Sequence, residues 1–139
     1  MTGRDANAGS RPRSLGAEDG SAAAEFVMVG ALLTVLTLGV MQLGLALLVR
    51  NTVLDAAAEG ARYAALADSG LGEGAARTRE LITMSIGPAY ATDVEASYGD
   101  YGGFPSVQVR VVAPLPLLAL FGVDRGLEVV GHAAVETLR

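Results

Sequence analysis

The stretch FVMVGALLTVLTLGVMQLGLALLV, residues 26–49, decides the fold, because none of its 24 residues carries a charge. At about 1.5 Å of rise per residue, a helix of this length extends roughly 36 Å, which is enough to cross a hydrocarbon layer of about 30 Å. Its hydroxyl residues, Thr34 and Thr37, can bond to the backbone of the same helix. The next residue is Arg50. The stretch therefore predicts a transmembrane helix over residues 21–50.

A cleaved secretory signal is the alternative interpretation of this run. The apolar part of such a signal has about 7–15 residues and closely follows a basic segment. Here the run is longer, and Glu18 and Asp19 precede it in place of a basic cluster. Length and flanking charge both favour a retained anchor.

The overall composition bounds what else the chain can hold. Its 139 residues allow one modest domain beside the anchor, and 51% are hydrophobic although only 5% are aromatic. The formal net charge is −5, and the basic residues are single, scattered arginines, which excludes a nucleic-acid interface. Without cysteine, the chain can form neither disulfides nor zinc–thiolate sites.

Two further helices are expected after the span. The alanine-rich residues 51–67 continue the helical period, with one apolar face and the charged side chains elsewhere. The apolar face consists of Val53, Ala57, Ala61 and Ala64, whereas Asp55, Glu59 and Arg62 lie outside it. Glycines and Ser69 then end this helix, and a second helix over residues 74–86 turns Leu81, Ile82 and Ile86 inward before Gly87-Pro88.

The last third of the chain changes to a period of two. Three segments alternate apolar and polar residues, with a glycine-rich turn over residues 99–103 between the first two. The apolar positions are Val94, Ala96 and Tyr98, then Val107, Val109 and Val111, then Leu127, Val129, Ala133 and Val135. This alternation predicts a small three-stranded antiparallel sheet with one buried face.

The fold class expected is therefore α+β. A cytoplasmic leader, residues 1–20, precedes the anchor, and disorder is expected through residue 24 because no periodicity is present. Residues 21–50 form the single-pass transmembrane helix, and residues 51–139 form an extracytoplasmic domain of helix and sheet.

The junction between leader and span reads Gly20-Ser21-Ala22-Ala23-Ala24-Glu25-Phe26. It resembles the cleavage site of type IV prepilins, which implies a cut between Gly20 and Ser21 by a prepilin peptidase. Glycine gives the flexible, slender segment that such a cut at the membrane surface needs. The plainer interpretation is that Glu25 only marks where the membrane begins.

Glu25 would be the fifth residue after that cut. A carboxylate held in hydrocarbon costs about 2.5–3.5 kcal/mol at a helix centre, and a partner lowers the cost. The terminal amine of a neighbouring subunit is a natural partner in a filament. Glu25 and Phe26 are therefore expected to set the register of subunits in an assembly.

Residues 20–65 resemble the opening of TadE-like proteins, the pseudopilins of the tight-adherence (Flp, type IVc) pilus system. The small-residue start before Glu25-Phe26, the single span, and the ending Glu59-Gly60-Ala61-Arg62-Tyr63-Ala64 carry this resemblance. The chain departs from the family in having acidic residues before the cut, and in having Gly30 where many members carry an early proline.

Two other stretches admit two interpretations each. Glu59, Gly60, Arg62 and Tyr63 form either a partner surface or a helix packed closely on the sheet through Gly60, with the charges solvated. The apolar stretch 114–122, PLPLLALFG, is too short to span. It either caps the sheet as core or presents a patch to membrane or a neighbour.

No catalytic constellation is recognisable. His132 is the only histidine, and no cysteine or suitably spaced carboxylate pair accompanies it, so no metal site, nucleophilic triad or cofactor site is expected. The chain is expected not to be an enzyme and to bind no small-molecule substrate.

The function that the resemblance implies is that of a TadE-like pseudopilin or minor pilus component in the bacterial cell envelope. Its expected partners are membrane lipid, a prepilin peptidase and other pilus subunits, with the N-terminus cytoplasmic. The alternative is an unprocessed single-pass membrane protein whose outer domain binds an envelope partner.

Overall fold

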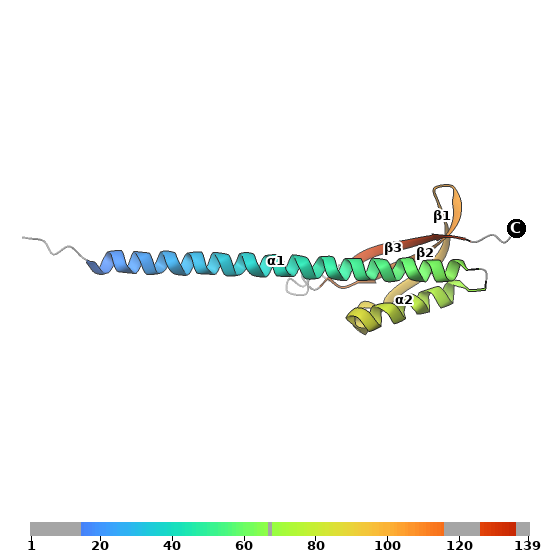
Figure 1. The fold of residues 1–139 in the computed structure, drawn as a ribbon, viewed down its shortest axis with the longest axis horizontal. Coiled ribbons are helices and arrows are strands. Elements are labelled where there is room, and N and C mark those ends of the chain that lie inside the picture. Colours follow the sequence, from blue (N-terminus) through green and yellow to red (C-terminus); the bar gives the residue numbers. More distant parts are fainter. Residues whose placement is uncertain (1–14, 67, 116–125, 136–139) are drawn as a thin grey trace, which may run out of the picture. The chain divides into compact units, whose positions relative to one another are not determined.

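The computed structural model describes residues 15–66, 68–115 and 126–135. The chain divides into two compact units, residues 1–39 and 40–139, and each is described by itself. The predicted α+β class is confirmed. The elements, labelled in Figure 1, are α1 (Leu15–Ala65), α2 (Leu71–Ile86), the 3-10 turn η1 (Pro88–Tyr90), β1 (Asp93–Tyr101), β2 (Phe104–Ala113) and β3 (Leu127–Ala134).

The described part of the first unit is the beginning of α1. The prediction of disorder through residue 24 is wrong for residues 15–24, because α1 already starts at Leu15. Alanine, leucine and glutamate are strong helix formers there and outweigh the glycines. Glu18 in the first turn also complements the positive end of the helix dipole. Residues 1–14 of the predicted leader lie outside the described residues.

The apolar run lies within α1 as continuous helix. Large apolar side chains on every side of it are exposed, from Phe26 at 79% to Leu48 at 56%. α1 is long and apolar enough to cross a membrane. An apolar surface of this kind all round a helix is suited to lipid or to other helices, and not to water.

Within the second unit, α1 changes to a one-sided pattern. The predicted apolar face is confirmed: Val53, Ala57 and Ala61 are fully buried and Ala64 nearly so. The charged residues Asp55, Glu59 and Arg62 are exposed, as expected. Alanine keeps this face flat, which lets other elements approach the helix axis closely.

Helix α2 begins at Leu71, three residues earlier than predicted. The side chain of Glu73 accepts a hydrogen bond of 3.1 Å from the Gly70 N–H, which caps the helix start. Of the residues expected inward, Ile82 is fully buried and Leu81 and Ile86 are half-buried. The helix ends at Ile86 as expected, and Gly87 follows at φ 107°.

The sheet is an antiparallel meander in the order β1-β2-β3, so the three predicted strands are confirmed. The hairpin turn is tighter than predicted: Tyr101 pairs with Phe104, and only Gly102 and Gly103 lie between them. Their φ values of 65° and 87° suit a two-residue turn that matches the twist of the strands. Residues 99–101 therefore belong to β1.

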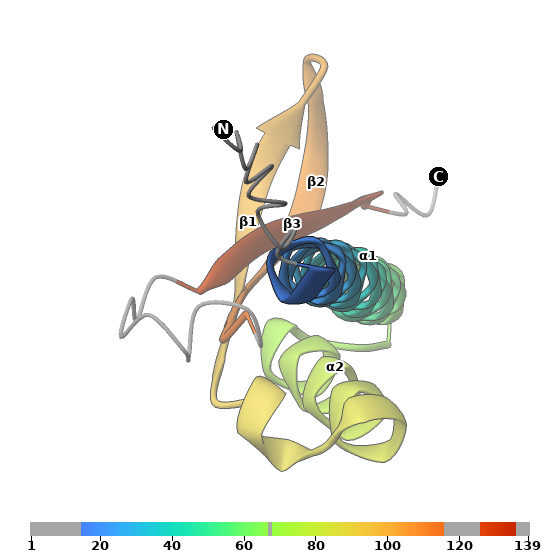
Figure 2. The same ribbon diagram turned by 90° about the vertical axis from the view of Figure 1, so that its left-hand side faces the viewer.

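Tyr98 departs from the predicted burial. It shares a sheet face with Val94, but its side chain is 66% exposed. β1 is an edge strand, so side chains toward its tip are covered from one side only. In Figure 2, the tip of the β1–β2 hairpin extends past β3.

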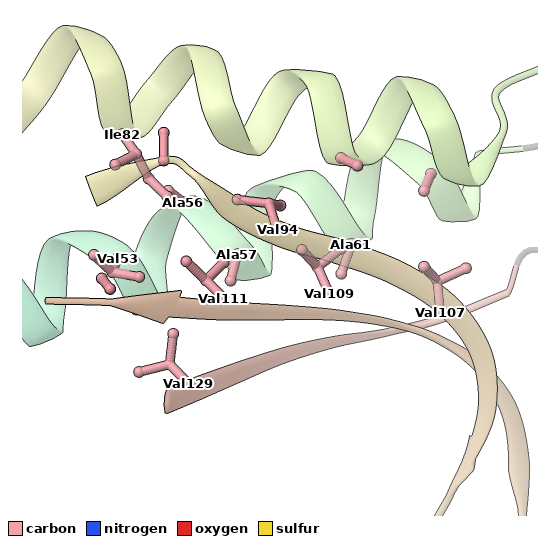
Figure 3. Packing of buried hydrophobic residues seen from close by; sticks show 14 of the residues in the cluster. Val53, Ala56, Ala57, Ala61, Ile82, Val94, Val107, Val109, Val111 and Val129 are labelled. Atoms are coloured by element: carbon pink, nitrogen blue, oxygen red, sulfur yellow. The ribbon is translucent and has the colours of Figure 1, made fainter. Parts of the chain in front are cut away.

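The core lies between one face of the sheet and the two helices (Figure 3). Val107, Val109 and Val111 of β2 are fully buried there, in one cluster with residues of α1 and with Ile82 of α2. Gly131 of β3 faces the backbone of Ala57 so closely that a Cβ at this position would overlap it. The absence of a side chain at Gly131 therefore sets how near α1 lies to the sheet.

Candidate functional site

The predicted processing junction lies inside helix α1. Gly20, Ser21, Glu25 and Phe26 are all helical and exposed, and apart from the adjoining backbone of the same helix no atom lies within 4 Å of where a Cβ on Gly20 would be. Glu25 follows the start of α1 by ten residues, or about three turns. In the intact chain it is therefore far from the first turn, whereas in a chain beginning at Ser21 it would be the fifth residue, next to the first turn.

A helical junction has a chemical consequence for any cut between Gly20 and Ser21. Peptidase active sites take extended backbone, so α1 would have to unwind locally before the bond could be reached. Two glycines, Gly16 and Gly20, lower the cost of unwinding, since each destabilises a helix interior by about 1 kcal/mol relative to alanine. The junction therefore combines an accessible bond with a weak helix.

The two hydroxyl groups within the apolar part of α1 are satisfied locally. The hydroxyls of Thr34 and Thr37 donate to the carbonyl oxygens of Gly30 and Leu33, each at 2.8 Å. The prediction of backbone bonding by these threonines is confirmed. Hydroxyl groups that are satisfied by their own helix in this way can enter hydrocarbon at low cost.

The stretch Glu59 to Tyr63 serves packing on one side and is open on the other. Gly60 is buried against α2, where a Cβ would overlap the Thr78 hydroxyl and approach the Gly74 carbonyl oxygen. The predicted close approach through Gly60 is therefore present, but to α2. The sheet is approached instead through Gly131, which the sequence analysis did not single out.

The exposed side of the same stretch could take part in contacts. Arg62 pairs with Glu59 at 3.2 Å, with side chains 66% and 49% exposed, and Tyr63 is 42% exposed. A surface ion pair of this kind contributes little to stability. Glu59, Arg62 and Tyr63 of the expected partner surface are therefore accessible. Gly60 is buried.

A second feature escaped the sequence analysis, on the sheet face that points away from the helices. A hollow of about 330 Å³ is lined by Tyr101, Phe104, Pro105, Ser106, His132, Ala133 and Ala134. The Tyr101 and His132 rings lie with centroids 4.8 Å apart. In the sequence, only the two aromatic residues Tyr101 and Phe104 on either side of a double glycine pointed to this hollow. The strand register that brings His132 to the same place could not be derived from residue spacing.

Within the described part of the chain, the electrostatic feature with a clear pKa shift is Arg110. The Arg110 guanidinium has its pKa raised by a hydrogen bond from Arg110 to the Glu95 carboxylate and by the charges of Glu95 and Glu128. The Arg110 side chain is 40% exposed, in an ion-pair ladder across the outer face of the sheet. Among the described residues, no group of three potential metal-binding side chains comes together.

Comparison with known protein families gives one match. Residues 20–62 fit the family described as TadE-like protein, and they begin at Gly20 and end at Arg62. We call residues 20–62 the TadE-like segment, because they resemble this family. The resemblance noted from the junction, the span and the alanine-rich helix is thereby confirmed over these residues.

The TadE-like segment lies wholly within α1. The match covers less than half of the chain and includes neither α2 nor the sheet. A search of the curated proteins and a search of the solved structures found no match. The hollow on the sheet thus lies outside the TadE-like segment.

Proposed function

We propose that this protein is a pseudopilin-like subunit, or minor component, in assembly of a tight-adherence (type IVc) pilus or a related secretion apparatus. It is anchored in the cell membrane by the apolar part of α1, with its N-terminus cytoplasmic and residues 51–139 outside. Its partners are membrane lipid, a prepilin peptidase and other pilus subunits.

One observation carries the proposal. The TadE-like segment joins, within one helix, a small-residue junction, an acidic residue and an apolar surface exposed on all sides. Such a surface is stable in lipid, and it is equally suited to pack against identical helices once they leave the lipid. A filament subunit needs both environments in turn, whereas a plain anchor needs only the first.

The cut between Gly20 and Ser21 would create the chemistry for packing. It frees an amine at Ser21 and moves Glu25 from the third turn of the helix to the first or second. There the carboxylate complements the positive end of the helix dipole, and it can accept hydrogen bonds from the amine of a neighbouring copy. This pairing would fix how neighbouring helices align along their axes, because an unpaired carboxylate among apolar helices is costly.

The test is the intact mass of the membrane form, made in cells with a prepilin peptidase. We expect loss of residues 1–20 from the wild-type chain, and retention of the leader in Gly20→Ala. The matched control is Gly16→Ala, which makes the same change one helical turn earlier and should be processed normally. Retention of the leader by the wild-type chain would contradict the proposal.

A companion variant separates insertion from assembly. Glu25→Leu should insert and be cut, but its incorporation into surface filaments should fall at least tenfold. Glu18→Leu is the control, since it removes an equal charge from a segment that the cut discards. Normal piliation with Glu25→Leu would show that Glu25 does not set register.

The helical state of the junction favours a second candidate, an unprocessed single-pass protein whose outer domain binds an envelope partner. Gly20 lies inside α1, and Glu18 and Asp19 precede it where the family usually carries basic residues. This candidate predicts an intact leader in the mature membrane, together with co-purification of a non-pilus envelope protein. The same mass measurement decides between the two candidates.

A further inference from the structure

We infer that the hollow at the tip of the β1–β2 hairpin binds the apolar segment Pro114–Phe121 of a second copy of this chain, joining copies head to tail. This inference rests on the proposed function and extends it by naming a contact between outer domains. Residues 116–121 of the segment lie outside the described residues, and only the sequence of the segment is used.

The lining of the hollow shows that it suits an uncharged, apolar occupant. None of its seven lining residues carries a formal charge, with His132 neutral. Tyr101 and Phe104 are 64% and 70% exposed, which is unusual for aromatic side chains near the end of a sheet. Exposed rings that border a hollow are features of sites that bind apolar or proline-containing segments.

Ser106 adds a specific hydrogen-bonding requirement. It is only 2% exposed, and its hydroxyl has no partner among the described residues. By strand alternation, its side chain is on the same sheet face as Phe104 and His132. A buried hydroxyl at the base of a hollow is suited to donate to a main-chain carbonyl of an occupant.

Residues 114–121, PLPLLALF, have the complementary chemistry. All eight are uncharged and apolar, and two are prolines. Proline has no N–H, so a proline-containing segment offers carbonyl acceptors with fewer donors to satisfy. An acceptor-rich apolar segment matches a ring-lined hollow that contains the buried Ser106 hydroxyl.

The segment of the same chain cannot fill the hollow. It connects the Ala113 end of β2 to β3, whereas the hollow lies at the Phe104 end. Ser106 and Ala113 are seven residues apart on β2, or roughly 24 Å. The connection has 13 residues, 114–126, so even fully extended only its middle residue would reach about 24 Å before returning.

A contact between two copies therefore joins opposite ends of the sheet. Such a contact is heterologous, because each copy offers a different surface, and it repeats into an open row where the rotation does not close. Neighbours in the row are offset along the strand direction by about the length of β2. A filament of subunits is one arrangement that needs this kind of contact.

The chain has no cysteine, which allows a direct crosslinking test. Ala134→Cys places a thiol at the hollow and Leu118→Cys places one in the segment. The two single variants are produced together, surface filaments are isolated, and thiols are oxidised. We expect a linked pair from the mixture and little from either variant alone. Replacing Ala134→Cys with Met84→Cys, an exposed control on α2, should lower the yield at least tenfold.

A further variant tests the hydroxyl. Ser106→Ala in the Ala134→Cys chain should lower the yield severalfold. Absence of the linked pair from assembled filaments, an equal yield with Met84→Cys, or an unchanged yield with Ser106→Ala would each overturn the inference. So would shielding of Leu118→Cys from a membrane-impermeant thiol reagent in unassembled protein, because the segment would then face lipid.

The two failures can be distinguished. If the variants enter filaments without linking, the proposed function holds and the head-to-tail contact is wrong. If the wild-type chain enters no assembly, the proposed function fails, and the contact falls with it.

Discussion

The two parts of α1 bury their apolar side chains in different ways. Over residues 26–48 the large side chains are leucine, valine, methionine and phenylalanine, and they are exposed on every side. Over residues 49–65 the buried face is mainly alanine, and it packs against α2 and the sheet. One continuous helix can therefore suit both lipid and a protein core when the size and distribution of its side chains change along it. Large apolar side chains on every side of a helix are suited to lipid, whereas small residues on one face allow close packing against other protein elements.

The largest expected effect comes from placing charge in the first part. Leu36→Arg with Leu38→Arg should cost about 5–7 kcal/mol of insertion free energy, since one arginine at a helix centre costs about 2.5–3.5 kcal/mol. Retention in the membrane pellet after an alkaline wash measures it and should be lost. The matched pair, Leu66→Arg with Met84→Arg, changes exposed residues after the span and should stay in the pellet. Equal retention of the two double variants in the membrane pellet would contradict the distinction between the two parts of α1.

The next effect tests close packing in the second part. Gly131→Ala should destabilise the outer domain by about 3 kcal/mol, because the new Cβ meets helix backbone at Ala57 that cannot move aside. Urea unfolding of the full chain in detergent, followed by tyrosine signals, measures this. Gly72→Ala is the control: it has open space on α2 and should gain up to about 1 kcal/mol. A neutral Gly131→Ala would show that α1 does not lie this close to β3.

A smaller effect concerns the edge of the sheet. The Arg79 guanidinium donates to the Val94 carbonyl oxygen at 2.7 Å, so a side chain from α2 covers part of the β1 edge. Arg79→Met should cost about 1.5 kcal/mol in the same unfolding measurement. Arg77→Met removes a surface pair with Glu80 and should cost less than about 0.5 kcal/mol. Equal costs would mean that the bond to β1 contributes no more than a surface pair.

The smallest expected effect belongs to the ion-pair ladder. The pKa of Arg110 is raised in the folded protein, so its contribution to stability is complete below the ordinary arginine pKa and is lost only as pH rises above it. Titration of Arg110 therefore leaves stability flat across the neutral range. Arg110→Gln should leave both the unfolding midpoint and its salt dependence within experimental error, because both of its ion pairs lie on the solvent-exposed surface. A clear shift of the midpoint would show that the ladder matters more than its exposure indicates.

The sequence sufficed to predict the features that depend on local pattern. Length and lack of charge predicted the span, three- and four-residue spacing predicted the Val53 to Ala64 face, and alternation predicted the strands. The start of α1 was missed because the charged, glycine-containing residues 15–24 have no hydrophobic period, although their four alanines favour helix.

What could not be predicted depends on contacts between distant residues. Gly60 of α1 packs against α2. The close approach between α1 and the sheet is made at Gly131 of β3, which is more than 70 residues after Gly60 in the sequence. The hollow likewise needs the register that places His132 beside Tyr101. Strand register is set by packing of the whole domain, and one segment does not contain that information.

The most direct test of the account is a thiol-accessibility measurement on the anchored protein. Cysteine is placed singly at Leu32, Leu36 and Val40, with Met84→Cys as an exposed reference, and intact membrane vesicles are treated with a bulky membrane-impermeant reagent. The account predicts that the three helix positions stay unlabelled until detergent is added, while Met84→Cys reacts at once when its side of the membrane is accessible. Rapid labelling of all four positions without detergent would contradict the claim that this part of α1 lies in lipid.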